Sequence, residues 1–311
     1  MSSHSDMPVV IPSEARDRDP PGRGPRLPVP LHTEVLVLLL PALLLSLAAS
    51  DGRENAYGHE AADAHDVTAL RVCADPNNLP FSNEKGEGFE NRIASLIASD
   101  LGLTLHYTWW PQRRGFVRNT LKAKVCDVVM EVPTGYELTG HTAPYYRSTY
   151  VFVTRADRHP AIRSFDDPAL RRLRIGIHMM GDDYANSPAA AALAKRGLGG
   201  QIVPFMIYGD YSQPDPPSRL VRAVATDSVD VAVVWGPLAG YFAKRSRVRL
   251  VLTPVSPPSA AFQYSISLGV RRGDSAWRAM LGAELARRRG DIRKILEEYG
   301  VPLVSERNRE R

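Results

Sequence analysis

The stretch from residue 70 to residue 154 most constrains the fold, because short apolar strands alternate in it with amphipathic helices. Between Gly88 and Gly102 the apolar residues recur at helical spacing, and the second glycine is a typical helix stop. The expected order is strand, helix, strand, helix, strand, over residues 70–74, 89–101, 103–110, 113–124 and 126–132. This alternation predicts an α/β fold with a parallel sheet covered by helices.

Polar and aromatic residues stand at the carboxyl ends of these three strands. Asp75 follows the first strand, and Glu131 lies at the end of the third. The second strand closes on Trp109 and Trp110. Ligands of parallel α/β sheets bind beyond the carboxyl ends of the strands. The sequence therefore predicts a binding cleft at this edge of the sheet.

The rest of the chain predicts a second lobe and a return to the first. A new sheet with its own helices starts near residue 163, and residues 265–274 form a strand that leads back. Two C-terminal helices over residues 277–299 carry apolar faces that the first lobe would bury. Two lobes joined by two crossings can hinge around a ligand. The expected parts are leader and signal peptide, lobe 1, lobe 2, return segment of lobe 1 and charged tail, over residues 1–50, 67–153, 156–255, 263–303 and 304–311.

The N-terminal part predicts export. Residues 35–49 form an apolar run that Pro41 interrupts, which is short for a membrane span and typical of a signal peptide. Small residues at Ala48 and Ser50 suit cleavage before Asp51. We therefore expect a periplasmic protein without stable membrane insertion after cleavage, and the alternative is a retained anchor.

Five segments carry a family resemblance, namely residues 70–83, 86–94, 107–121, 126–137 and 144–155. They resemble the MoxJ/XoxJ-like, quinoprotein dehydrogenase-associated periplasmic binding proteins, which are encoded with methanol dehydrogenases that carry pyrroloquinoline quinone (PQQ). The resemblance covers most of residues 68–303. It implies a type II periplasmic-binding-protein fold and a role in methanol oxidation.

On this resemblance we expect an accessory protein that binds a PQQ-dependent methanol dehydrogenase for maturation or activation. One alternative is the substrate-binding component of an importer for a small neutral or cationic solute. A less favoured alternative is an enzyme on the same fold, similar to a dehydratase, with Glu131 and His178 as an acid–base pair. No sequence motif of a hydrolase, metalloprotease or phosphate loop supports an enzyme, and we expect no cofactor and no metal. The net charge of +5 is far from that of a nucleic-acid binder.

Cys73 and Cys126 are the only two cysteines, and an exported protein meets an oxidising compartment. A bridge would close a loop of about 50 residues and stabilise the fold by roughly 4 kcal/mol in the chain-entropy model. Against it, Cys73 lies late in its strand whereas Cys126 begins another, which could separate their Cα atoms beyond about 7 Å. The sequence leaves the disulfide open.

The loop after the first strand and the tryptophan pair supply the first candidate contacts. In solute-binding proteins this loop usually gives a polar contact and a stacking aromatic, which are roles for Asp75, Asn77, Asn78 and Phe81 here. A turn built from proline and asparagine is the alternative. Because strand side chains alternate, one tryptophan of the pair must face away from the core, where it could anchor a ligand or partner.

Two departures argue against a free amino acid as the ligand. The segment over residues 131–140 lacks the arginine with which amino-acid-binding members grip a carboxylate. The segment over residues 178–188 carries Asp182 where an anion nest is usual. Aromatic and methionine side chains favour a polypeptide partner instead. The predicted cleft residues are Asp75, Asn77, Asn78, Phe81, Trp109, Trp110, Glu131, Tyr136, Tyr145, His178, Met179, Asp182, Tyr211 and Trp235.

Overall fold

The computed structural model describes residues 68–158, 161–179, 187–207, 211–257, 259 and 261–305. The predicted leader and signal peptide, Asp182 and most of the predicted tail lie outside the described residues. Within them, no helix is long and apolar enough to cross a membrane.

Ten strands pair into one continuous sheet, and a further two form a small hairpin. The ten are β1 (Ala69–Ala74), β4 (Thr104–Trp109), β5 (Val128–Pro133), β6 (Gly140–His141), β7 (Tyr146–Arg155), β8 (Ile175–His178), β9 (Ile202–Phe205), β10 (Val231–Trp235), β11 (Leu250–Pro254) and β12 (Gln263–Val270). The hairpin strands are β2 (Asn77–Asn78) and β3 (Ser82–Asn83). The helices are α1 (Phe89–Leu101), α2 (Phe116–Asn119), α3 (Pro188–Ala194), α4 (Ser218–Ala225), α5 (Gly236–Lys244), α6 (Ser275–Arg287) and α7 (Arg289–Glu298), with short 3₁₀ turns at Pro168–Arg172 and Gly199–Gln201.

The first three predicted strands form the parallel sheet that the alternation indicates. β1 lies between β4 and β5 and runs parallel to both. β12 then pairs antiparallel with β5, so the chain does return to this group of strands. α1, α6 and α7 contribute Phe89, Trp277 and Ile292, respectively, to a single apolar cluster. Met280, predicted to share the buried face of α6, is instead 40% exposed.

The second group of strands also contains a parallel set, here joined by antiparallel strands. β8, β9 and β10 run parallel, while β7 and β11 run antiparallel to their neighbours. β9 ends the order of strands and contains Pro204, which suits an edge because a proline lacks the N–H that a central strand must donate. Separate apolar clusters line the two faces of this sheet.

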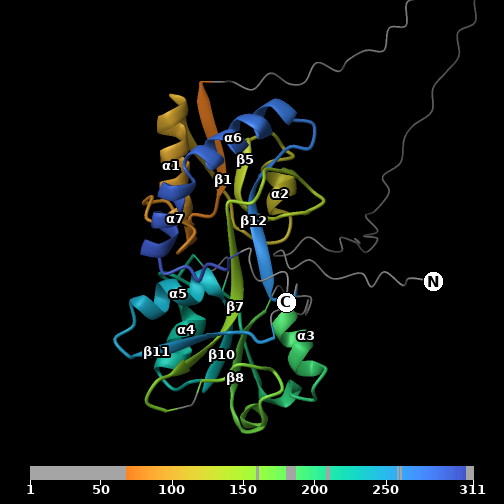
Figure 1. Cartoon of the computed structure of the whole chain (residues 1–311), viewed down its shortest axis with the longest axis vertical. Helices are drawn as coiled ribbons and strands as arrows, with labels where there is room; N and C mark the ends of the chain where they lie inside the picture. The colour runs from red at the N-terminus through yellow and green to blue at the C-terminus, as the bar shows by residue number, and fades with distance from the viewer. Residues whose placement is uncertain are drawn as a thin grey trace, which may run out of the picture. The chain divides into compact units, whose positions relative to one another are not determined.

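Two long strands, β7 and β12, connect the groups and lie side by side (Figure 1). Residues 146–149 of β7 pair with β12, and residues 150–155 of the same strand pair with β10 and β11. We use "lobe 1" for β1, β4, β5 and β12 with α1, α2, α6 and α7, and "lobe 2" for β8–β11 with α3–α5. The exact lobe boundaries stay a prediction.

One predicted helix, over residues 113–124, is mostly wrong. Only α2, a single turn, forms there, and it begins after Gly115, whose φ of 84° lies in the left-handed region. The turn ends at Thr120, whose hydroxyl bonds back to the Phe116 carbonyl and competes with the helix. α1, by contrast, has the predicted bounds and stops at Gly102 with φ 65°.

The two cysteines form a disulfide with their Cα atoms 5.4 Å apart. The argument from strand register fails because β5 begins only at Val128, so Cys126 lies outside the regular ladder and is free to approach β1. Beside it, Asp127 is 1% exposed and accepts hydrogen bonds from Arg71 at 2.6 and 2.7 Å and from Arg271 at 2.7 Å. These contacts fasten the start of β5 to β1 and to the end of β12.

Candidate functional site

Asp75, at the carboxyl end of β1, is the centre of the first site. Its carboxylate is 2% exposed and accepts from the backbone N–H groups of Asn77 at 2.8 Å and Gln112 at 2.7 Å. Burial raises the pKa of Asp75, although these two backbone donors work against the rise. The strand end thus presents a partly desolvated carboxyl, as the sequence predicted for this edge of the sheet.

Lobe 2 reaches this carboxyl directly. The hydroxyl of Tyr211 donates to Asp75 Oδ2 at 3.0 Å, and Asn77 Nδ2 donates to the carbonyl of Gln213 at 3.0 Å. Both partners lie in the segment between β9 and α4, some 136 residues along the chain. The carboxyl end of β1 is therefore tied to lobe 2 by the chain's own groups.

Glu131, at the end of β5, is the centre of the second site. Its Oε1 accepts from the indole N–H of Trp235 and from the hydroxyl of Tyr146, each at 3.3 Å. Trp235 ends β10 of lobe 2, where its ring packs against the rings of Tyr150 and Tyr264. This is a second contact between the lobes, again through a carboxyl of lobe 1.

A second buried carboxyl, Glu90 of α1, faces Glu131. Gly88 makes this possible, since a Cβ there would meet the Phe81 carbonyl oxygen at 1.9 Å, and the close approach lets the Glu90 N–H bond that carbonyl at 3.0 Å. The Glu90 and Glu131 carboxyls share a hydrogen bond. One of two adjacent buried carboxyls must carry a proton, because like charges in a low dielectric repel strongly.

The pKa values follow from burial and from this pairing. Burial, followed by the charge of Glu131, raises the pKa of Glu90 well above its usual range, and Asp75 adds to the rise. Burial raises the pKa of Glu131 to about 7, while hydrogen bonds from Tyr146, Trp235 and Glu90 limit the rise. The pKa values of both carboxyls are therefore raised, and that of Glu131 lies near neutral pH.

The tryptophan pair divides as strand alternation requires. Trp109 stacks on Tyr107 with ring centroids 4.6 Å apart and packs against the lobe 1 core. Trp110 is 40% exposed, while its backbone N–H bonds the carbonyl of Ala74 at 2.9 Å. An exposed indole on a firmly bonded backbone suits a contact with a partner.

Several predicted cleft residues belong to the core. Phe81 is 2% exposed and packs edge-on against Phe89, so it offers no stacking surface to a ligand. Tyr136 is 8% exposed and packs in the cluster around the disulfide. Burial of these apolar rings against neighbouring side chains is favourable relative to exposure to water. The sequence pattern of the loop, from which Phe81 was predicted as a contact, carries no information on whether its ring is buried.

Four further predicted residues lie in supporting positions. Asn78 is buried and donates to the side-chain oxygen of Gln112 at 2.8 Å. Tyr145 donates to the Met130 carbonyl at 2.9 Å, and Met179 packs partly buried on the lobe 2 core. Burial lowers the pKa of His178 to about 4, so this imidazole is neutral at pH 7. A neutral histidine of such low basicity is a poor general base, which weakens the acid–base pair considered from the sequence.

Glu90 was missing from the predicted site. A readable signal existed for Glu90, because it precedes Ile93 and Ile97 by three and seven positions and so lies on the buried face of α1. A carboxyl on an apolar helix face is unusual and points to a special environment.

The described residues offer this site no metal centre, since none of them form a group of three or more histidine, cysteine or acidic side chains. What the arrangement supplies is hydrogen-bonding carboxyls, aromatic rings and a proton that can be gained or lost near pH 7.

Comparison with known proteins identifies the family. Protein MoxJ of Methylorubrum extorquens is 32% identical over 296 residues, which span 88% of this chain and 96% of that protein. Protein MoxJ of Paracoccus denitrificans is 31% identical over 261 residues, or 77% and 90% of the two chains. The chain belongs to the MoxJ family. No family model matches the sequence.

Solved structures agree with the MoxJ assignment. Periplasmic binding protein XoxJ from Methylobacterium extorquens AM1 is 35% identical, with a TM-score of 0.64 over 76% of this chain and all of that chain. MxaJ from Methlophaga aminisulfidivorans MPT is 26% identical, with a TM-score of 0.66 over the same shares. An ancestral cationic amino acid solute-binding protein, 19% identical with a TM-score of 0.58 over 75% of this chain and 96% of that chain, shows the fold alone. The predicted type II periplasmic-binding-protein fold is confirmed.

Proposed function

We propose that this MoxJ-family chain is a periplasmic accessory protein of a PQQ-dependent methanol dehydrogenase, and that it binds the dehydrogenase for maturation or activation. Its membership of the MoxJ family and its likeness to the periplasmic binding protein XoxJ support this role. The partner is the part of the proposal that needs a physical argument of its own.

The observation that carries the proposal is that protein groups already occupy the carboxyls between the lobes. Asp75 is bonded by Tyr211, and Glu131 by Trp235 and Tyr146. A cationic solute at either carboxyl would have to replace these donors and pay the cost of desolvating its own charge. A protein partner has no such competition, because it can bind exposed side chains at the rim such as Trp110.

The importer component stays as the second candidate, and one observation favours it. Three carboxyls, those of Asp75, Glu90 and Glu131, lie close enough to raise one another's pKa or to share hydrogen bonds. Opening of the lobes would expose these carboxyls to a solute that carries an amine. A thermal-shift screen of amines and neutral solutes tests it, since a ligand specific to the folded state must raise the melting temperature.

Calorimetric titration tests the proposal itself. The exported protein, residues 51–311, is titrated into apo and PQQ-loaded methanol dehydrogenase from the same organism, at low and at physiological salt. Saturable binding is expected, and a preference for the apo enzyme would indicate a role before cofactor loading. If neither form binds and the solute screen finds a ligand, the proposal is wrong and the protein is the substrate-binding component of an importer.

A matched pair of variants locates the contact. Trp110 and Met280 are both large apolar side chains of lobe 1 and are both 40% exposed. Trp110→Ala is expected to weaken binding of the dehydrogenase about tenfold, as truncation of a tryptophan anchor typically does. Met280→Ala, on α6, is expected to leave binding unchanged. Equal effects of the two substitutions would remove the cleft rim from the interface.

A further inference from the structure

Lobe 2 carries an arginine-rich groove that none of the predicted cleft residues lines. It consists of two hollows, of about 360 and 480 Å³. Arg222, Arg245 and Arg247 line the first hollow, and Arg155 and Arg249 line the second. Val248 borders both, and Arg155 donates to the carbonyl of Ala225 in the first hollow at 2.9 Å. We call these two joined hollows the arginine groove.

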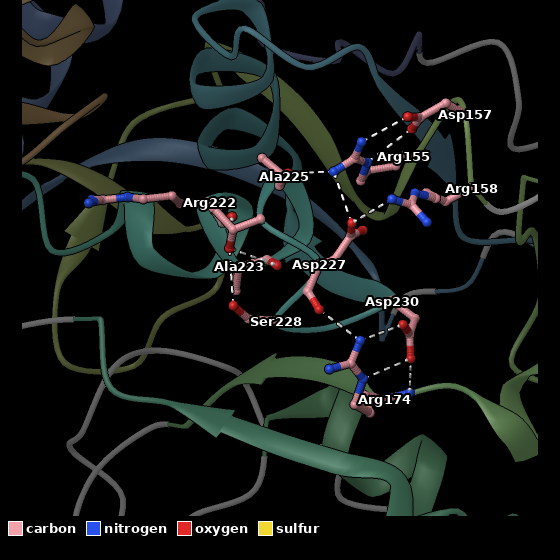
Figure 2. A network of polar contacts seen from close by, with 11 residues as sticks. Arg155, Asp157, Arg158, Arg174, Arg222, Ala223, Ala225, Asp227, Ser228 and Asp230 are labelled. Carbon is pink, nitrogen blue, oxygen red and sulfur yellow. Dashed lines mark hydrogen bonds and ion pairs between the residues drawn. The ribbon is translucent and has the colours of Figure 1, made fainter.

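Most of the acidic charge near the groove is already paired. Arg155 bonds Asp157 at 2.8 Å and Asp227 at 3.1 Å, and Asp227 also meets Arg158 at 3.5 Å (Figure 2). Asp157 is the one acidic residue that lines either hollow, and its carboxylate is held by Arg155. The two arginines and two aspartates of this network carry no net charge together.

The remaining arginines of the groove have no such partners. Within the described residues, the guanidinium groups of Arg222, Arg245, Arg247 and Arg249 meet no carboxylate. Figure 2 shows Arg222 extending away from the ion-pair network. Four exposed cations gathered along one groove create a positive potential that only an external anion can neutralise.

Two of these arginines are held in place before anything binds. The guanidinium carbon of Arg245 lies 3.6 Å from the centre of the Tyr241 ring, in a cation–π contact. Arg222 donates to the Ser218 hydroxyl. Because these side chains are restrained already, less rotamer entropy is lost on binding.

The floor of the groove tells which anion fits. Phe242 and Val248, both partly exposed, line the first hollow together with the arginines and add apolar surface to it. A free phosphate would make no use of this apolar surface. A peptide with acidic residues on either side of an apolar one would contact both the guanidinium groups and the apolar surface. Two joined hollows also suit an extended segment better than one small ion. We propose that the arginine groove binds an acidic, extended polypeptide segment with a central apolar side chain, and that the partner of the proposed function, on which this assignment rests, supplies it.

A defined peptide tests the groove without the dehydrogenase. The probe is a fluorescein-labelled octapeptide of Glu, Asp, Leu and Phe, compared with one in which Gln and Asn replace the acids. Polarisation measurements use the wild-type chain, Arg247→Glu/Arg249→Glu in the groove, and Arg278→Glu/Arg289→Glu as control. All four arginines are exposed and the two variants change the net charge equally. Because all four side chains are exposed, both variants should fold, which circular dichroism checks.

The wild type should bind the acidic peptide, the neutral peptide should not bind, and the groove variant should lose about tenfold in affinity while the control changes little. Failure of the wild type to bind the acidic peptide would overturn the groove. Equal losses in both variants would also overturn it, because they would report net charge alone.

The same variants then enter the dehydrogenase titration. Wild-type binding that only the groove variant weakens supports the whole proposal. Wild-type binding that the groove variant retains overturns the groove and leaves the proposed function standing. Peptide binding without dehydrogenase binding has the opposite meaning, because the groove then stands and its proposed partner is wrong.

Discussion

Two carboxyls stand four residues apart, Asp127 just before β5 and Glu131 within it, and they behave in opposite ways. Burial alone would raise the pKa of Asp127, but Arg71 and Arg271 more than reverse it, so this pKa lies below its usual range. Glu131, in the strand that follows, has only neutral donors and another carboxyl around it, and its pKa is raised to about 7. The charges beside each group separate a structural carboxylate from one that can titrate at neutral pH.

The largest expected effect comes from breaking the ion pairs of Asp127 with Arg71 and Arg271. Asp127→Asn should lower the free energy of unfolding by about 3 kcal/mol, because removal of one partner leaves two arginines without their buried counter-charge. Urea unfolding at pH 7 measures it. Glu131→Gln, the control within β5, should cost less than about 1 kcal/mol, since glutamine resembles the protonated acid. Equal costs would contradict the comparison.

The next largest effect is on the pH dependence of stability, which should differ in sign between Glu131 and Asp127. The folded protein holds a proton on Glu131 more tightly than the unfolded chain does, so stability should fall as pH rises from about 4.5 towards 7. At about 1.4 kcal/mol per pH unit, the loss is at most roughly 3 kcal/mol. The contribution of Asp127 has the opposite sign, because its lowered pKa gives stability that is lost only in acid.

Urea unfolding of the wild type and of Glu131→Gln at pH 5 and pH 8 measures this dependence. The variant should lose less stability than the wild type between the two pH values. A wild type and variant with the same pH profile would mean that Glu131 is an ordinary carboxylate.

The smallest expected effect concerns the contacts between the lobes. Tyr211→Phe removes one hydrogen bond to the buried Asp75 and should cost about 1 kcal/mol, because Tyr211 itself is partly exposed. Combined with Trp235→Phe, it should also increase the radius of gyration measured by X-ray scattering. Tyr264→Phe, which removes a hydroxyl bonded within its own loop to Ala261, should leave the radius unchanged. An unchanged radius in all variants would show that these contacts do not hold the lobes together.

Much of the fold could be predicted because its signals are local. The spacing of apolar residues up to Gly102 gave the bounds of α1, and Pro204 placed β9 at an edge. The helix over residues 113–124 failed because basic residues and good helix propensity did not reveal the left-handed backbone at Gly115. The spacing of apolar residues does not predict a helix boundary that depends on the backbone conformation of one residue.

The site was only partly predictable because its bonds span the chain. The positions of the strand ends pointed to Asp75 and Glu131, and aromatic content pointed to Trp235, but nothing in the sequence joined Asp75 to Tyr211, 136 residues away. The aromatic content of the loops also overstated the cleft, since Phe81 and Tyr136 turned inward. Composition can say that a region is aromatic, whereas only packing decides which rings face a partner.

The central claim is that Glu131, between the lobes, accepts hydrogen bonds from the protein's own donors and titrates near neutral pH, instead of standing fully charged for a cationic solute. Carbon-13 NMR titration of the glutamate and aspartate carboxyls, assigned with Glu131→Gln and Asp127→Asn, measures this directly. The account predicts a pKa of about 7 for Glu131 and one below the usual range for Asp127. A Glu131 that titrates near its ordinary value, about 4.3, would contradict it and favour the importer.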